Sequence, residues 1–175
     1  MPIKSRVRTV PHYPKQGIMF RDITTVLKDP IGLRATIDEL VRRYKDVKID
    51  KIAGVESRGF IIGTPLAYAL GVGFVPIGKN RTLRPATTRH AYERKCDTDR
   101  IEIHTDAISK GENILLVDDL IATGGTAEAA VILIEKMGGK IVECCFMIDL
   151  PDIGGRARLE KRGQKVFALC EFEGD

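Results

Sequence analysis

The chain has 175 residues, enough for one domain with a full hydrophobic core. Hydrophobic residues make up 43% of it and charged residues 30%, as is ordinary for a soluble globular protein. The formal net charge of +4 suits small anionic substrates but is too small to indicate nucleic-acid binding. No stretch approaches the ~18 apolar residues of a membrane span, and no signal peptide is evident, so we expect a cytoplasmic protein without membrane contact.

The four cysteines form no C-x-x-C pair, and the adjacent Cys144 and Cys145 lie in an apolar run. Such cysteines are typical of buried free thiols in a reducing compartment. We therefore expect no disulfide framework.

Residues 1–28 are a short basic lead-in followed by a turn-rich segment. Asp29 and Pro30 then predict the start of a helix, because Asp favours the N-cap and Pro the first helical position. The predicted helix carries one apolar stripe with the spacing i, i+4, i+7, i+8, i+11, formed by Leu33, Ile37, Leu40, Val41 and Tyr44.

Residues 51–55 are a short apolar run typical of a buried strand, and a second helix follows Gly59. Residues 74–77 predict another strand. Residues 78–100 are mostly polar and predict a long loop. A loop of this length inside a compact domain is usually functional, often as a lid.

Residues 101–104 alternate like an antiparallel or edge strand, and residues 114–117 predict a fully buried one. A helical stripe through Ala130, Leu133, Ile134 and Met137 ends at Gly138. Strand-like runs at 141–149 and 165–170 complete the chain. Strands that alternate with helices predict a doubly wound α/β fold, with a mainly parallel sheet flanked by helices.

The segment after residue 117 combines two acids, Asp118 and Asp119, with a loop of small residues that leads into a helix. Ligands of open α/β sheets bind at the carboxyl ends of strands, and glycines and free N–H groups at a helix N-terminus receive phosphate. The carboxylates would repel a phosphate, so they would face sugar hydroxyls or water on a metal. A solvated strand end and a simple turn are the alternative. The loop consists of Ala122, Thr123, Gly124, Gly125 and Thr126.

Residues 117–126 resemble the phosphoribosyl-pyrophosphate (PRPP) motif of type I phosphoribosyltransferases. Residues 13–24 are similar to the N-terminal signature of adenine phosphoribosyltransferases, and residues 56–60 resemble the pyrophosphate loop of that family. The Gly154-Gly155 region also fits in order. The resemblance covers nearly the whole chain and implies one type I phosphoribosyltransferase domain over 1–175, with a base-binding hood at 1–28 and a flexible lid loop at 78–100.

The resemblance implies a role for each segment. The backbone of the loop 122–126 would hold the 5′-phosphate, and Asp118 and Asp119 would reach the ribose hydroxyls. The pyrophosphate would lie against Glu56, Ser57, Arg58 and Lys79. The base would contact Met19, Phe20, Arg21 and Leu120. Mg²⁺ would be held mainly by PRPP, with no direct protein ligand, and a homodimer is expected.

The implied activity is purine salvage, in which phosphoribosyl passes from PRPP to adenine and gives AMP and pyrophosphate. Backbone contacts to the base leave its identity open, so a 6-oxopurine or another base is an alternative. A PRPP-binding regulator is a second alternative. Regulators of that kind carry an added DNA-binding domain, for which a signature that starts near Tyr13 leaves no room.

The lid differs from the family in its chemistry. The catalytic glutamate of the family falls on Lys95, the neighbouring tyrosine on Cys96, and two basic residues on Gly78 and Thr82. Glu56 also stands where the family usually has Asp.

A lysine with a reference pKa near ~10.4 is no general base at neutral pH unless it is strongly desolvated. Either Glu93 takes that role while basic lid residues neutralise the leaving group, or no base is needed, since a purine in the right tautomer offers a lone pair. Solvated loop charges are the alternative for both lid residues. The candidate catalytic residues are Arg58, Glu93 and Lys95.

Overall fold

A computed structural model describes residues 3–79, 83, 87–93 and 98–174, with only the backbone described for 87–93 and 98–99. Its centre is a seven-stranded sheet of order β5-β6-β4-β3-β7-β8-β9. The strands from β4 to β9 in this order are parallel, while β6 and β5 add an antiparallel edge. The strands are β3 (Lys51–Val55), β4 (Gly73–Lys79), β5 (Thr87–Glu93), β6 (Thr98–His104), β7 (Asn113–Ile121), β8 (Lys140–Asp149) and β9 (Val166–Glu171).

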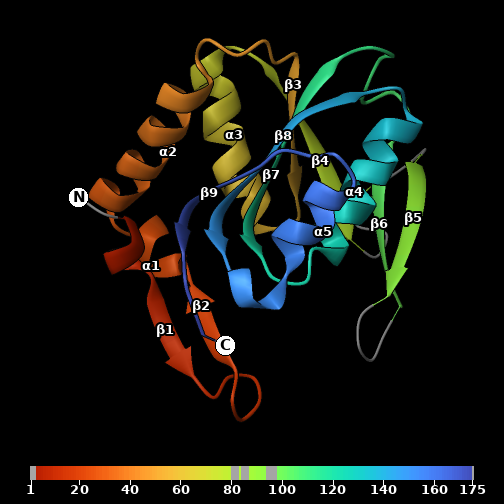
Figure 1. Cartoon of the computed structure of the whole chain (residues 1–175). Helices are drawn as coiled ribbons and strands as arrows, with labels where there is room; N and C mark the ends of the chain where they lie inside the picture. The colour runs from red at the N-terminus through yellow and green to blue at the C-terminus, as the bar shows by residue number, and fades with distance from the viewer. Residues whose placement is uncertain (1–2, 80–82, 84–86, 94–97, 175) are drawn as a thin grey trace.

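Helices cover both faces of this sheet (Figure 1). One face carries α1 (Thr24–Leu27), α2 (Pro30–Tyr44) and α3 (Arg58–Leu70), and the other carries α4 (Gly125–Lys136) and α5 (Gly155–Lys161). The start of α2 is as predicted, because the Asp29 carboxylate accepts the backbone N–H groups of Ile31 and Gly32, both at 3.2 Å. No helix in the described ranges is long and apolar enough to cross a membrane.

Alternating side chains of the strands build two hydrophobic cores, one on each face. Cys145 packs with the residues under α2 and α3, while Cys144 packs with those under α4 and α5. Burial raises the pKa of both thiols to about 12, so they are inert core residues, as expected. The doubly wound, mainly parallel architecture predicted from the sequence is confirmed.

The N-terminal segment forms a small unit of its own beside the sheet (Figure 1). It contains the 3-10 helix η1 (Ile3–Arg6) and a two-stranded antiparallel sheet of β1 (Arg8–Pro11) and β2 (Met19–Asp22). Arg8 and Asp22, paired in register, also form an ion pair. We did not predict these strands, since four residues each are too few to show an alternating pattern.

The segment 78–100 is not the continuous loop that we predicted. It holds β5 and the start of β6, which pair from Thr87 with His104 to Glu93 with Thr98. Their polar composition hid them, because an antiparallel strand at a sheet edge needs little apolar surface. Lys95, Cys96 and Thr82 lie outside the described residues.

The strand β7 is longer than predicted. It continues through Ile121, so Asp118 and Asp119 belong to the strand and do not follow it. Pairing with β8 continues as far as Ile121 with Asp149. The two carboxylates are therefore held by strand backbone on the rigid sheet.

Gly54 allows the first turn of α3 to approach β3 closely. A Cβ at this position would lie 2.7 Å from the Gly59 carbonyl oxygen and from the ring of Phe74. We predict that Gly54→Ala lowers the free energy of unfolding by about 1–3 kcal/mol, measured by urea denaturation, because backbone must move to admit the methyl group. Gly73→Ala is the matched control, since its Cβ would meet only Lys51 Cγ at 3.6 Å. Equal losses in both variants would contradict this explanation.

Candidate active site

A cavity of about 290 Å³ opens where the parallel strands β3, β4 and β7 end. This is the edge at which open α/β sheets bind ligands. The cavity brings together the four residues predicted to bind pyrophosphate and the two acids predicted to reach ribose. Its lining consists of Glu56, Ser57, Arg58, Lys79, Asp118 and Asp119.

An ion pair joins the two sides of the cavity. Arg58 Nε, at the start of α3, donates to Asp119 Oδ2 on β7. Burial lowers the pKa of Arg58, but the hydrogen bond and charge of Asp119 outweigh it and leave the pKa above its ordinary value. Arg58 is 44% exposed, so a firmly cationic guanidinium is accessible to an anionic ligand.

Asp118 lies in a less favourable environment for its charge. Burial, followed by the adjacent charge of Asp119, raises the pKa of Asp118 well above its ordinary value. The backbone N–H of Asp119 donates to Asp118 Oδ1 at 2.8 Å and opposes this shift. Two adjacent carboxylates in such a site favour a ligand that brings hydroxyl donors or a cation.

Glu56 holds the end of β4. Its Oε2 accepts the backbone N–H of Lys79 at 2.6 Å, and its own N–H donates to Ile77 O at 2.9 Å. The peptide bond between Glu56 and Ser57 is cis. The Glu56 side chain thus fixes the backbone of Lys79 beside the cavity.

The loop after β7 has the geometry that a bound phosphate requires. Gly124 has φ of 80° and precedes the first residue of α4, whose first N–H groups have no partner inside the helix. Thr123 Oγ1 accepts the Gly125 N–H at 3.4 Å. The 12-residue helix then places the positive end of its dipole at the loop.

A phosphoribosyl transferase domain model matches residues 23–169. The adenine phosphoribosyltransferase of Nitrosospira multiformis is 69% identical over 175 residues, which is 100% of both chains. The chain belongs to the adenine phosphoribosyltransferase family.

Solved structures agree with this family. The crystal structure of the adenine phosphoribosyltransferase from Thermoanaerobacter pseudethanolicus has a TM-score of 0.92 at 43% identity and covers 97% of this chain and 98% of its own. The Saccharomyces cerevisiae enzyme, complexed with adenine and an imino-altritol bisphosphate, has a TM-score of 0.89 at 38% identity, with 96% of each chain covered.

The predicted base-binding residues lie mainly on β2. The Phe20 ring meets the Tyr13 ring edge-on, with centroids 5.4 Å apart. The Arg21 guanidinium lies 4.5 Å from the ring centre of Phe172 in the C-terminal segment, and its Nη1 donates to Thr9 Oγ1 at 2.5 Å. Leu120 packs in the sheet core under α2 and α3.

Asp22, at the end of β2, is a buried carboxylate that was not singled out from the sequence. Burial raises its pKa, but hydrogen bonds from the Thr24 N–H and from Arg8 outweigh this and hold the pKa at about 2. Its place inside residues 13–24, the segment similar to the family signature, was its only signal in the sequence.

Leu83 lies directly over Gly78. A Cβ at Gly78 would lie 2.7 Å from Leu83 Cγ, so Leu83 occupies the space of any side chain there. The Leu83 N–H donates to the buried Glu102 at 2.8 Å, which fixes Leu83 over β4. A side chain at Gly78 would have to displace Leu83.

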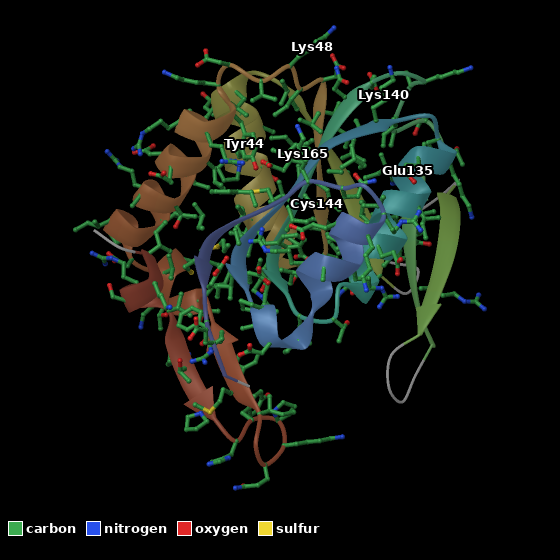
Figure 2. All side chains as sticks on the ribbon, in the orientation of Figure 1. Tyr44, Lys48, Glu135, Lys140, Cys144 and Lys165 are labelled. Carbon is green, nitrogen blue, oxygen red and sulfur yellow. The ribbon has the colours of Figure 1, made fainter. Side chains whose placement is uncertain are left out.

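A second cavity of about 290 Å³ lies toward the opposite end of the sheet, near Tyr44 and Lys165 (Figure 2). Arg43 and Glu143 bind each other there through contacts of 3.0 and 2.9 Å. The Tyr44 hydroxyl also donates to Glu143 at 2.6 Å. Arg43, Tyr44 and Glu143 therefore satisfy one another.

We predict that Asp118→Asn raises the melting temperature at pH 7.5 by about 2–4 °C, as a gain near 1 kcal/mol does in a chain of this size. A carboxyl whose pKa in the folded protein lies above its unfolded value of 3.8 destabilises the fold as pH rises above about 4. The loss of stability reaches its full size once the pH exceeds the folded pKa, and it remains at higher pH. The asparagine should therefore gain nothing near pH 4.

Thermal unfolding followed by circular dichroism at pH 4 and pH 7.5 measures this effect. Asp46→Asn, at an exposed position, is the control. Asp119→Asn removes the partner of Arg58 and should not stabilise. A shift for Asp118→Asn that is independent of pH would contradict the assignment.

Proposed function

We propose that this protein transfers the 5-phosphoribosyl group of PRPP to adenine, releasing AMP and pyrophosphate in purine salvage. The observation that carries the proposal is that Arg58, at the start of α3, pairs with Asp119 of β7 in one cavity. A single short loop then connects β7 to α4. Full-length identity of 69% to an adenine phosphoribosyltransferase supports the same substrates.

The proposed reaction forms a bond from a purine ring nitrogen to the anomeric carbon, while the bond from that carbon to pyrophosphate breaks and the ring nitrogen loses its proton. Arg58 and Lys79 would compensate the charge of the leaving pyrophosphate. The N-terminus of α4 and the loop 122–126 would hold the 5′-phosphate, and Asp118 and Asp119 the ribose hydroxyls. Only the anomeric carbon then moves between leaving group and base.

The cavity fits Mg²⁺ carried by PRPP. Carboxylate oxygens of Asp118 and Asp119 line it, and Mg²⁺ in phosphate-transferring sites is usually held by one or two carboxylates together with substrate phosphates. The ion supplies charge neutralisation for the pyrophosphate when it is bound. The raised pKa of Asp118 is the local condition that a cation would relieve.

We also infer a cytoplasmic homodimer. The dimer follows from the resemblance to the family, in which lids and active sites lie near a subunit interface. Ile61 and Tyr68 are 47% and 88% exposed and lie seven residues apart on α3, so they share an apolar face for such a contact. The reduced, buried Cys144 and Cys145 fit a cytoplasmic location.

We predict pyrophosphate release from PRPP and Mg²⁺ with adenine, and at least about 10²-fold less with hypoxanthine, guanine or xanthine, since unpaired polar groups penalise a wrong base. EDTA should abolish the release. Turnover with guanine or hypoxanthine in place of adenine would establish the 6-oxopurine alternative. Tight PRPP binding without turnover of any base would indicate a regulator.

The position of Glu93 supports a role in the lid. The strand β6 pairs with Lys79 at the cavity edge through Ile101, and its earlier residues continue past that edge to the pair of Thr98 with Glu93. The hairpin therefore carries Glu93 beyond the end of the sheet, on the side of the cavity. We propose Glu93 as the general base that the family supplies from the position of Lys95.

We predict that Glu93→Gln lowers kcat about 10²-fold or more, the range of general-base catalysis, with little change in the KM for PRPP. Adding Lys95→Glu to Glu93→Gln should restore activity, because it returns a carboxylate to the family position. Steady-state rates with adenine measure both effects. An unchanged kcat in Glu93→Gln would show that no lid base is required.

A further inference from the structure

Asp149 is a buried charge outside the cavity. It ends β8, its exposed fraction is 0%, and its Oδ1 has no hydrogen-bond partner within the described ranges. Arg156 Nε of α5 donates to the other oxygen, Oδ2, at 2.5 Å. A carboxylate buried this completely depends strongly on its cationic partner.

Arg156 holds α5 against two strands at once. Besides Asp149 on β8, its Nη1 donates to the Val166 carbonyl of β9 at 2.9 Å, and its Nη2 to Glu171 at 3.4 Å. Backbone at the same place joins β8 to β9, since the Phe172 N–H donates to Asp149 O at 3.0 Å. A planar guanidinium can make these contacts together, whereas a lysine ammonium cannot.

The residue before Arg156 touches the phosphate loop. The Gly155 N–H donates to Ala122 O at 2.9 Å, and a Cβ on Gly155 would lie 2.7 Å from Gly124 N. The approach is so close that a small shift of α5 must move the loop. Asp149 also faces Ile121, the residue before the loop, in the strand register.

We propose that Arg156, anchored by Asp149, is a positioning residue for the 5′-phosphate of PRPP. Its contacts fix α5 so that Gly155 supports the loop 122–126 in the geometry that receives phosphate. Arg156 acts through Gly155 and is no catalytic residue. The inference rests on the proposed function, because it takes the loop as the phosphate site.

The test separates the KM for PRPP from the KM for adenine in Arg156→Lys. We expect the KM for PRPP to rise about tenfold or more, the usual effect of losing an outer-shell partner, and the KM for adenine to stay within about twofold. Calorimetry with ribose 5-phosphate alone should show the same loss of affinity. Arg158→Lys is the matched control, since Arg158 lies on the same helix and pairs with Glu128 at 2.6 Å.

The outcomes distinguish this inference from the proposed function. A wild-type protein without turnover of PRPP and adenine would remove the proposed function itself. Normal wild-type turnover with an unchanged KM for PRPP in Arg156→Lys, or with equal rises in both KM values, would overturn the role of Arg156. If Arg156→Lys does not fold, Asp149→Asn combined with Arg156→Gln removes both charges, and the same selective loss for PRPP is expected.

Discussion

The ion pair between Arg58 and Asp119 joins the start of α3 to the neighbouring strand β7, and the site depends on it. The pair can form because Gly54 of β3 lies beside Val117 of β7 in register, so the residues that follow β3 meet the continuing strand β7. Gly59 allows the approach, since a Cβ there would lie 2.8 Å from Val117 O. Backbone packing thus brings Arg58 and the acids Asp118 and Asp119 to one cavity before any ligand binds.

The charged side chains in this cavity are better suited to binding a ligand than to stabilising the protein. Glu56, Asp118 and Asp119 line it with Arg58 and Lys79, and burial works against the ionised form of Asp118. A substrate that carries phosphates together with a divalent cation offers partners to both signs of charge. Such sites commonly lower the stability of the fold in exchange for binding.

The parts of the fold that were predictable follow from local patterns. The cap at Asp29 and the apolar core of β7 are each set by a few neighbouring residues. The hairpin of β5 and β6 was missed because its strands are defined by pairing with each other, with side chains that are polar on much of their length. The site shows the same contrast. Residues 122–126 form a local motif that can be recognised in the sequence, whereas the pairing of Asp149 with Arg156 depends on how α5 packs against the sheet.

The fold holds its segments with unequal tightness. The loop 122–126 follows a buried parallel strand, and Gly124 and Gly155 pack too closely to admit a side chain at either position. The hairpin of β5 and β6 forms an antiparallel edge of the sheet, and Leu83 lies over Gly78 of the neighbouring strand β4. A catalytic carboxylate on such an edge needs only to reach the base, so a hairpin that extends past the cavity can present it from more than one position. A carboxylate on β7, by contrast, cannot be moved to a neighbouring position in the same way, because the register with β8 fixes where each side chain of β7 lies.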